Sequence, residues 1–250
     1  MEKKAYEIVN DIQKRHWWFA ARRNILFSIL EKKYEKYSEG SVLDIGAGSG
    51  GNFDLLSRFG VVTGVEMDKD ALGYCKKNNL MGNFYHGFLP DGLPVEITRK
   101  KYNLIAMLDV LEHIEDDSGA LNTICRLNDK EGMLLITVPA YQWLFSQADE
   151  FAWHKRRYTK KQLCSKLEKS GYSIVYSTYY NTLLFPLAFI SRMCSKRRGA
   201  NIVKKELTII PGINLILKTV FSFERILIPM IKFPFGLSIC VLAEKTDKIY

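Results

Sequence analysis

The amino-acid sequence predicts an α/β fold, built on a mostly parallel, seven-stranded sheet flanked by helices. Short apolar runs alternate with stretches of helical spacing between residues 40 and 180, which is the pattern of βαβ units. A glycine-rich segment separates the first apolar run from the first of these helices. The chain has 250 residues, of which 47% are hydrophobic and 25% charged, so a disordered or low-complexity protein is excluded.

The first part of the chain predicts a helical lead followed by two strand–helix units. Residues 2–37 carry apolar side chains at helical spacing between charges, and a glycine closes the stretch. The short apolar run 42–46 is the first expected strand, and 51–60 is the helix that follows it. Residues 61–66 are the second expected strand, and 69–79 the second helix.

The middle of the chain continues the same alternation. A short third strand is expected at 83–87 and a strongly apolar fourth strand at 102–110. Acidic residues open the stretch 115–128, as the helix dipole favours, so we expect a helix there. The apolar run 132–139 is the fifth expected strand.

The last part of the chain completes the sheet and adds an insertion. A helix is expected over 159–172, the sixth strand over 172–180 and the seventh over 235–245. About 55 residues separate these last two strands, which is too many for a simple connection. We therefore expect one domain over 1–250 with four parts, namely a helical lead or lid (1–39), a cofactor-binding core (40–180), a basic, partly apolar helical insertion (181–234) and the last strand (235–245).

The glycine-rich segment after the first strand points to a nucleoside-containing cofactor. Gly46, Gly48 and Gly51 satisfy the G-x-G-x-x-G pattern, in which glycines let the backbone turn sharply and approach a ligand. Glu66 ends the second strand, where an acid can accept hydrogen bonds from ribose hydroxyls. The fold is therefore expected to be Rossmann-like. A nicotinamide-dependent oxidoreductase is one function that this pattern permits.

Three motifs in order resemble those of the class I S-adenosylmethionine-dependent methyltransferases. They are VLDIGAGSGGN, GVEMD and LDVLEHI, within residues 40–140, and the most similar group is the type 11, ubiquinone-biosynthesis-like one. The resemblance implies methyl transfer from S-adenosylmethionine by in-line displacement, with S-adenosylhomocysteine as product. It also implies the cofactor contacts, with Asp44 near the methionine amino group, Gly46, Gly48 and Gly50 along the methionine and ribose, Glu66 on the ribose hydroxyls, Met67 on the adenine, and Asp109 and Val110 at the end of the fourth strand.

The ends of the chain resemble a set of bacterial members of that group. The shared segments are HWWF at 16–19 followed by two arginines, HKRRY at 154–158, and PFGLS at 234–238. This resemblance implies an acceptor among surface-polysaccharide precursors or lipid-linked compounds. Trp17 and Trp18 could form a lid that contacts the acceptor, or they could anchor the first helix in the core.

The candidate catalytic residues lie after the fourth and fifth strands, whose carboxyl ends carry the site in α/β folds. His113 and His154 could accept a proton at neutral pH, and Tyr158 belongs to the same polar cluster. Arg156 and Arg157 suit contact with a carboxylate or phosphate of the acceptor. We expect no metal, since the scattered cysteines form no C-x-x-C pair.

The basic residues concentrate in the C-terminal third. Residues 151–232 hold 16 Lys and Arg against three acidic residues, interleaved with apolar runs. This pattern is typical of an interfacial helix, so we expect a cytoplasmic protein that can contact the inner face of the membrane through 181–234. No nucleic-acid motif accompanies the charge, and nucleic acid is not expected as a partner. A non-catalytic methyltransferase-like module that docks through this third is the remaining alternative.

Overall fold

The computed structural model describes residues 12, 15–34, 40–77, 82–189 and 209–246. Its centre is a seven-stranded sheet of order β3-β2-β1-β4-β5-β7-β6. The strands are β1 (Ser41–Ile45), β2 (Val61–Glu66), β3 (Asn83–His86), β4 (Tyr102–Leu108), β5 (Asn128–Pro139), β6 (Tyr172–Tyr180) and β7 (Ser238–Lys245). Only β7 runs antiparallel to its neighbours, so the predicted mostly parallel, Rossmann-like sheet is confirmed.

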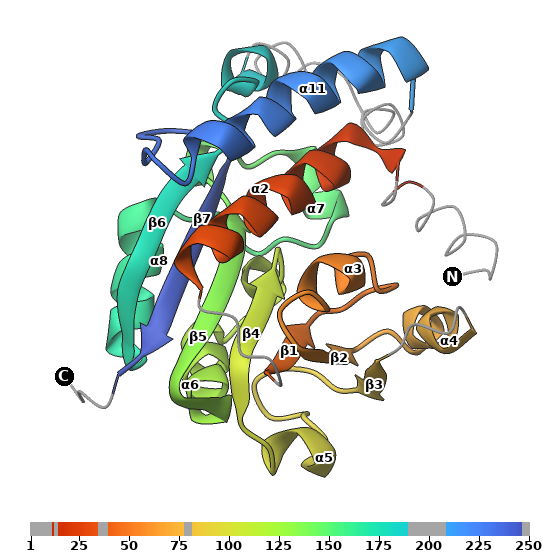
Figure 1. The fold of residues 1–250 in the computed structure, drawn as a ribbon, viewed down its shortest axis with the longest axis vertical. Coiled ribbons are helices and arrows are strands. Elements are labelled where there is room, and N and C mark those ends of the chain that lie inside the picture. The colour runs from red at the N-terminus through yellow and green to blue at the C-terminus, as the bar shows by residue number, and fades with distance from the viewer. Residues whose placement is uncertain (1–11, 13–14, 35–39, 78–81, 190–208, 247–250) are drawn as a thin grey trace.

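Helices cover both faces of this sheet. They are α2 (Trp17–Lys33), α3 (Phe53–Leu56), α4 (Lys69–Lys77), α5 (Val95–Thr98), α6 (Asp117–Leu127), α7 (Gln147–Phe151), α8 (Lys160–Lys169) and α11 (Pro211–Leu227), with short 3-10 turns η1 (Leu111–His113) and η2 (Gln142–Leu144). Figure 1 shows α2 crossing one face of the sheet, with α11 alongside it, and α6 and α8 on the opposite face. No helix within the described ranges is long and apolar enough to cross a membrane.

Helix α2 joins the core through one stripe of its surface. Ala21, Ile25, Leu26, Ile29 and Leu30 are completely buried, and their spacing of three and four residues places them on one face. The predicted helical lead is therefore part of the core, where the structure describes it. Residues 1–11, 13–14 and 35–39 of the predicted lead lie outside the described residues.

Strand β5 begins at Asn128, four residues before the predicted start. The buried Asn128 amide donates to the carbonyl oxygens of Tyr102 and Met133, at 3.3 and 3.1 Å, and its side-chain oxygen accepts the hydroxyl of Tyr172 at 2.6 Å. These bonds draw the end of the predicted helix 115–128 into the sheet.

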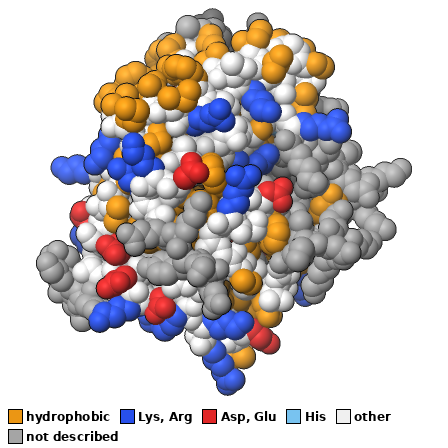
Figure 2. Space-filling view, in the orientation of Figure 1, with side chains coloured by type: hydrophobic (Ala, Val, Ile, Leu, Met, Phe, Trp, Pro, Cys, Tyr) orange, Lys and Arg blue, Asp and Glu red, His pale blue; other side chains and the backbone are white. Residues whose placement is uncertain are grey.

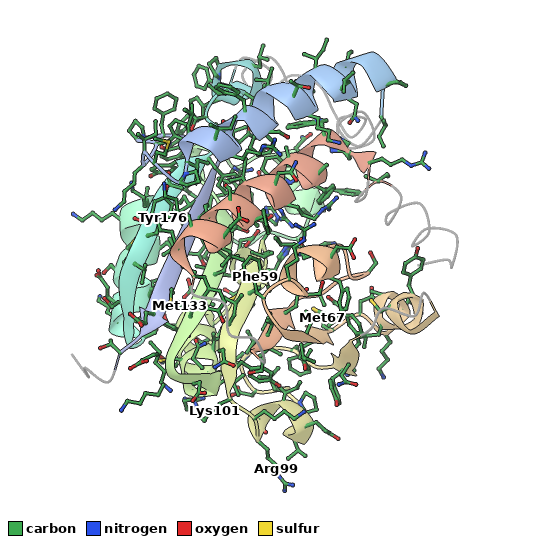
Figure 3. All side chains as sticks on the ribbon, in the orientation of Figure 1. Phe59, Met67, Arg99, Lys101, Met133 and Tyr176 are labelled. Carbon is green, nitrogen blue, oxygen red and sulfur yellow. The ribbon has the colours of Figure 1, made fainter. Side chains whose placement is uncertain are left out.

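Helix α3 is shorter than the predicted 51–60. The chain leaves the helix after Leu56, and Phe59 enters the core against the rings of Phe27 and Tyr34, beneath α2 (Figure 3). A Cβ at Gly60 would meet the carbonyl oxygen of Gly40 at 2.0 Å, so the backbone packs too closely there for a longer helix.

Candidate functional site

The glycine-rich loop after β1 is shaped by left-handed backbone conformations. Gly46, Gly48 and Gly50 have φ angles of 71°, 56° and 83°. A Cβ at Gly46 would meet the side chain of Val110 at 2.4 Å, whereas a Cβ at Gly48 would have no atom within 4 Å. The loop is therefore packed against the segment after β4 on one side and has open space at Gly48, where a ligand can approach the backbone.

Glu66 at the end of β2 is bonded to this loop. One carboxylate oxygen accepts the backbone N–H of Gly48 at 2.8 Å, and the other accepts that of Asp68 at 2.9 Å. The next residue, Met67, is 69% exposed and lies between β2 and α4 (Figure 3). This arrangement places an acid and an accessible apolar side chain together, as binding of a ribose and its base requires.

Asp44, one residue before the end of β1, is a buried carboxylate. Its Oδ1 receives no hydrogen bond from any residue that the structure describes. Burial raises the pKa of Asp44 to about 7, against the opposing charge of Arg22 and with a contribution from Glu66. A buried carboxylate oxygen without a hydrogen-bond donor suits a cationic amino group of a ligand. The amino group would supply both the donor that this oxygen lacks and an opposite charge.

Arg22 connects α2 to the same end of the sheet. This buried side chain donates to Asp109, which follows β4, and to the side-chain oxygen of Asn52 at 3.2 Å. Thr137 also donates to Asp109, at 2.9 Å. The sequence motifs predict Asp109 in the site but no role for Arg22 or Asn52. The one sequence feature that marks Arg22 is its place between an aromatic run and the apolar residues of the same helix.

His113 and His154 meet although 41 positions separate them. Their rings lie 4.7 Å apart at an angle of 76°. His154 ends the turn after α7, and its Nδ1 lies 2.8 Å from a carboxylate oxygen of Asp149. Burial and the neighbouring His154 lower the pKa of His113. At neutral pH the His113 ring is therefore unprotonated and can accept a proton or bind a ligand.

Arg157 and Tyr158, two other members of the predicted polar cluster, bind carboxylates in the interior of the protein. Arg157 is buried, with its Nε and Nη2 each 2.7 Å from Asp149 Oδ1. The buried hydroxyl of Tyr158 donates to Asp117 at 2.9 Å, and burial raises its pKa, as does Asp117. These contacts correct the expectation that Arg157 and Tyr158 face the acceptor. Arg156 remains partly exposed and forms ion pairs with Glu115 and Asp117.

Trp17 and Trp18 pack against α11. The Trp18 ring stacks on Phe221 at 5.3 Å and on Tyr180 at 6.2 Å, and Trp17 meets Phe221 edge-on. Both side chains remain partly exposed. The structure thus shows an anchoring role for this pair of residues, and contact with an acceptor stays a prediction.

The chain matches the family model described as a methyltransferase domain over residues 13–177. No curated protein sequence matches it significantly. The matched range includes the glycine loop, Glu66, Asp109 and both histidines, so the family assignment covers the site and not only the sheet.

Solved structures share the fold at low sequence identity. A chain of the complex between the Haloferax volcanii Trm112 methyltransferase activator and a methyltransferase is 12% identical, with 94% of this chain and 92% of that chain covered and a TM-score of 0.60. A SAM-dependent methyltransferase from Archaeoglobus fulgidus is 16% identical, with coverage of 89% and 94% and a TM-score of 0.55. The magnesium protoporphyrin IX methyltransferase from Synechocystis, with bound SAH, is 13% identical, with coverage of 95% and 84% and a TM-score of 0.52.

The site and the family agree on one cofactor. The orphaned Asp44 oxygen, the open backbone at Gly48 and the acid at Glu66 fit the amino group and ribose of S-adenosylmethionine. The family match sets aside the nicotinamide-dependent oxidoreductase that the glycine pattern alone permits. The chain belongs to the methyltransferase-domain family and is a class I, S-adenosylmethionine-dependent methyltransferase.

Proposed function

We propose that this methyltransferase modifies a lipid-linked acceptor, such as a membrane-bound glycan precursor, while it rests on an anionic membrane surface. The observation that carries the proposal is an exposed apolar face on α11 and the turn after it. Its members are Ile213, Leu215, Ile216, Phe223, Ile226, Met230 and Ile231, each at least 50% exposed. Figure 2 shows hydrophobic side chains gathered at the α11 end of the molecule, with Lys and Arg side chains below them.

This face is linked to the cofactor site through α2. Asn214 of α11 accepts the backbone N–H of Trp17 at 2.8 Å, and the rings of Trp17 and Trp18 meet Phe221. The same helix α2 carries Arg22, which donates to Asp109 beside the glycine loop. An acceptor whose lipid lies in the membrane under α11 would therefore reach the site along α2. Apolar side chains flanked by Lys218, Arg225 and Lys232 suit an anionic bilayer.

The chain's own residues orient the reactants in this proposal. S-adenosylmethionine supplies a methyl group already activated by its sulfonium. Asp44 would hold the amino group of the methionine part and Glu66 the ribose hydroxyls, so that catalysis consists largely of orientation and exclusion of water. The rings of His154 and His113 lie 4.7 Å apart, and His113 is close enough to Asp109 to feel its charge, so one of the two can accept the proton of an acceptor hydroxyl. Arg156, the partly exposed arginine, is the candidate contact for an acceptor phosphate.

The acceptor class is tested by incubating the purified chain with methyl-labelled S-adenosylmethionine and a bacterial membrane lipid extract. Label that enters the organic phase supports a lipid-linked acceptor. Label found only in water-soluble compounds, when a cytosolic extract is supplied instead, would assign a free small-molecule or glycan-precursor acceptor.

Membrane contact is tested by cosedimentation with phosphatidylglycerol and phosphatidylcholine vesicles. We expect binding to the anionic vesicles that weakens at high salt. We also expect about tenfold weaker binding for Ile216→Glu, because a charge replaces an exposed apolar side chain that would enter the bilayer. Val95→Glu is the matched control, because Val95 is 53% exposed on α5, away from α11. Equal binding by both variants would remove α11 as the contact.

A further inference from the structure

Glu112, His113 and His154 form a cluster that the methyltransferase site does not fully use. Each can offer one ligand atom, and these three atoms lie within 4.8 Å of one another. Glu112 and His113 are adjacent in η1, directly after β4, and His154 follows α7. The backbone N–H of Lys155 donates to the carbonyl oxygen of Glu112 at 2.8 Å, which fixes the two segments side by side.

Glu112 is a completely buried carboxylate without a compensating donor. Neither of its oxygens accepts a hydrogen bond from any residue in the described part of the chain. His154 Nε2 lies 3.9 Å from Oε1, and the charges of Arg22 and Arg157 also act on this carboxyl group. Buried carboxylates are normally paired or coordinate a metal, and this one has no hydrogen-bonding partner among the described residues, so both of its oxygens are available to a bound cation.

Both histidines are oriented so that Nε2 can bind a ligand. His154 Nδ1 lies 2.8 Å from Asp149 Oδ1, and His113 Nδ1 lies 3.3 Å from the carbonyl oxygen of Trp153. Each acceptor favours a proton on Nδ1, which leaves the lone pair on Nε2. Metal-binding histidines are held in this way by a carboxylate or a carbonyl, and Asp149 is itself fixed by Arg157.

We propose that Glu112, His113 and His154 bind one divalent first-row transition metal, with positions left open for an oxygen of the acceptor. Two imidazoles and one carboxylate suit Mn²⁺, Fe²⁺, Co²⁺ or Zn²⁺. Ligand atoms around such an ion lie about 3–3.5 Å apart, given bond lengths of about 2.0–2.2 Å. The three atoms now lie within 4.8 Å of one another, so binding would draw them closer together, and the exposed His113 gives the ion access to the site.

The proposed metal deepens the proposed function, on which its role in catalysis rests. When the metal is bound both histidines are ligands, so neither would take the acceptor proton. An acceptor hydroxyl on the metal would instead lose its proton to water, because the cation stabilises the oxyanion. That oxygen would form the new bond to the methyl carbon, while the sulfur–methyl bond breaks and its electron pair stays on sulfur. The donor becomes S-adenosylhomocysteine, and no oxidant or reductant is needed.

The test is a Co²⁺ titration of the full chain, without an affinity tag and after treatment with a chelator. We expect visible absorption bands that saturate at one ion per chain and disappear when Zn²⁺ is added. Glu112→Gln and His154→Ala should each weaken binding by at least about 100-fold. His86→Ala is the matched control, because His86 is exposed at the end of β3, and it should bind Co²⁺ as the unaltered chain does.

The Glu112→Gln variant shows whether lost Co²⁺ binding is due to the missing carboxylate or to misfolding. It replaces an unpartnered buried carboxylate by an amide of the same shape, so the metal-free variant should unfold at the same or a higher temperature than the unaltered chain. Added Zn²⁺ should raise the unfolding temperature of the unaltered chain alone. Absence of Co²⁺ bands, or equal bands in Glu112→Gln, would overturn the metal site.

S-adenosylmethionine binding by calorimetry separates the two proposals. Binding to the metal-free chain, together with methylation that is insensitive to chelator, would leave the proposed function intact and refute the metal's role. Co²⁺ binding at Glu112 without labelling of any lipid acceptor would support the metal site and contradict the proposed function.

Discussion

Asp44 shows that the cofactor site is built at the expense of stability. Its side chain is buried, one oxygen has no partner among the described residues, and burial raises its pKa to about 7. A carboxyl whose pKa is raised in the folded state stabilises the fold only at low pH, and this contribution is lost as the pH rises toward 7. The ionised form is nevertheless the form that a cationic amino group would pair with.

Asp44→Asn should therefore stabilise the free protein and weaken cofactor binding. At pH 8 the variant gains up to ~4 kcal/mol in free energy of unfolding, because a three-unit shift of one pKa corresponds to that energy. At pH 5.5 the gain is smaller. Urea unfolding at both pH values, with calorimetric titration of S-adenosylmethionine, measures the two effects. A variant that is less stable at pH 8 would contradict this account of Asp44.

Arg157 and Arg156 are neighbours in sequence but should differ sharply when replaced. Arg157→Ala removes the guanidinium that pairs with the buried Asp149 and leaves it with His154 and Ser146, so we expect a loss of about 3 kcal/mol in free energy of unfolding. Arg156 is partly exposed and pairs with the exposed Glu115 and the buried Asp117. Because Asp117 keeps Lys166 and Tyr158 as partners, Arg156→Ala should cost less than about 1 kcal/mol. Equal losses in urea unfolding would show that the Arg157–Asp149 pair is not structural.

At the scale of elements, Glu224 fixes α11 to the end of β6. Its buried carboxylate accepts three backbone N–H groups, from Asn181, Thr182 and Leu183, at 2.7, 2.7 and 2.8 Å. The rings of Phe221, Trp18 and Tyr180 stack in the same region. Among the described residues, α11 is thus held to α2 and the end of β6 by Glu224, by this aromatic cluster and by the bond from Trp17 to Asn214, although most of its outer face is exposed.

Glu224→Ala should release α11. Three buried donors lose their acceptor, so we expect a loss of about 3 kcal/mol or more in stability and faster cleavage by protease near 181–183. Glu168→Ala serves as the control, because Glu168 is an exposed acid on α8. Unchanged proteolysis of Glu224→Ala would mean that the aromatic cluster and the Trp17–Asn214 bond hold the helix without Glu224.

The sequence predicts regular elements best where local pattern and tertiary packing agree. Strands β2 and β6 match their predicted bounds at both ends, because each is a continuous run between a glycine and a polar turn. The start of β5 could not be predicted, since it depends on hydrogen bonds from Asn128 to residues on other strands. Short helices such as α5 and α7 were missed because four or five residues carry too little periodicity.

The candidate site was predicted only in part for a similar reason. The cofactor loop is contiguous in sequence, and its glycines carry their own signal. The contact between the His113 and His154 rings, by contrast, forms only in the folded chain. The same is true of the burial of Glu112 without a hydrogen-bond donor among the described residues. Arg157 carried a charge pattern typical of a surface, but its burial against Asp149 depends on the turn after α7.

At the scale of the whole molecule, the cofactor should stabilise the chain as a unit. Its predicted contacts come from β1, β2 and the segment after β4, while Arg22 joins α2 to Asp109. At 100 times its dissociation constant, a ligand adds about 2.7 kcal/mol of stability. For a domain of this size we therefore expect S-adenosylmethionine and S-adenosylhomocysteine to raise the unfolding temperature by about 5–10 °C.

NADH should not change the unfolding temperature, because the family to which the chain belongs uses S-adenosylmethionine and not a nicotinamide cofactor. A shift with NADH alone would reverse the choice of cofactor. Because stabilisation by S-adenosylmethionine depends only on affinity and ligand concentration, Arg22→Ala, which removes the bond to Asp109, should reduce the temperature shift and the calorimetric affinity together.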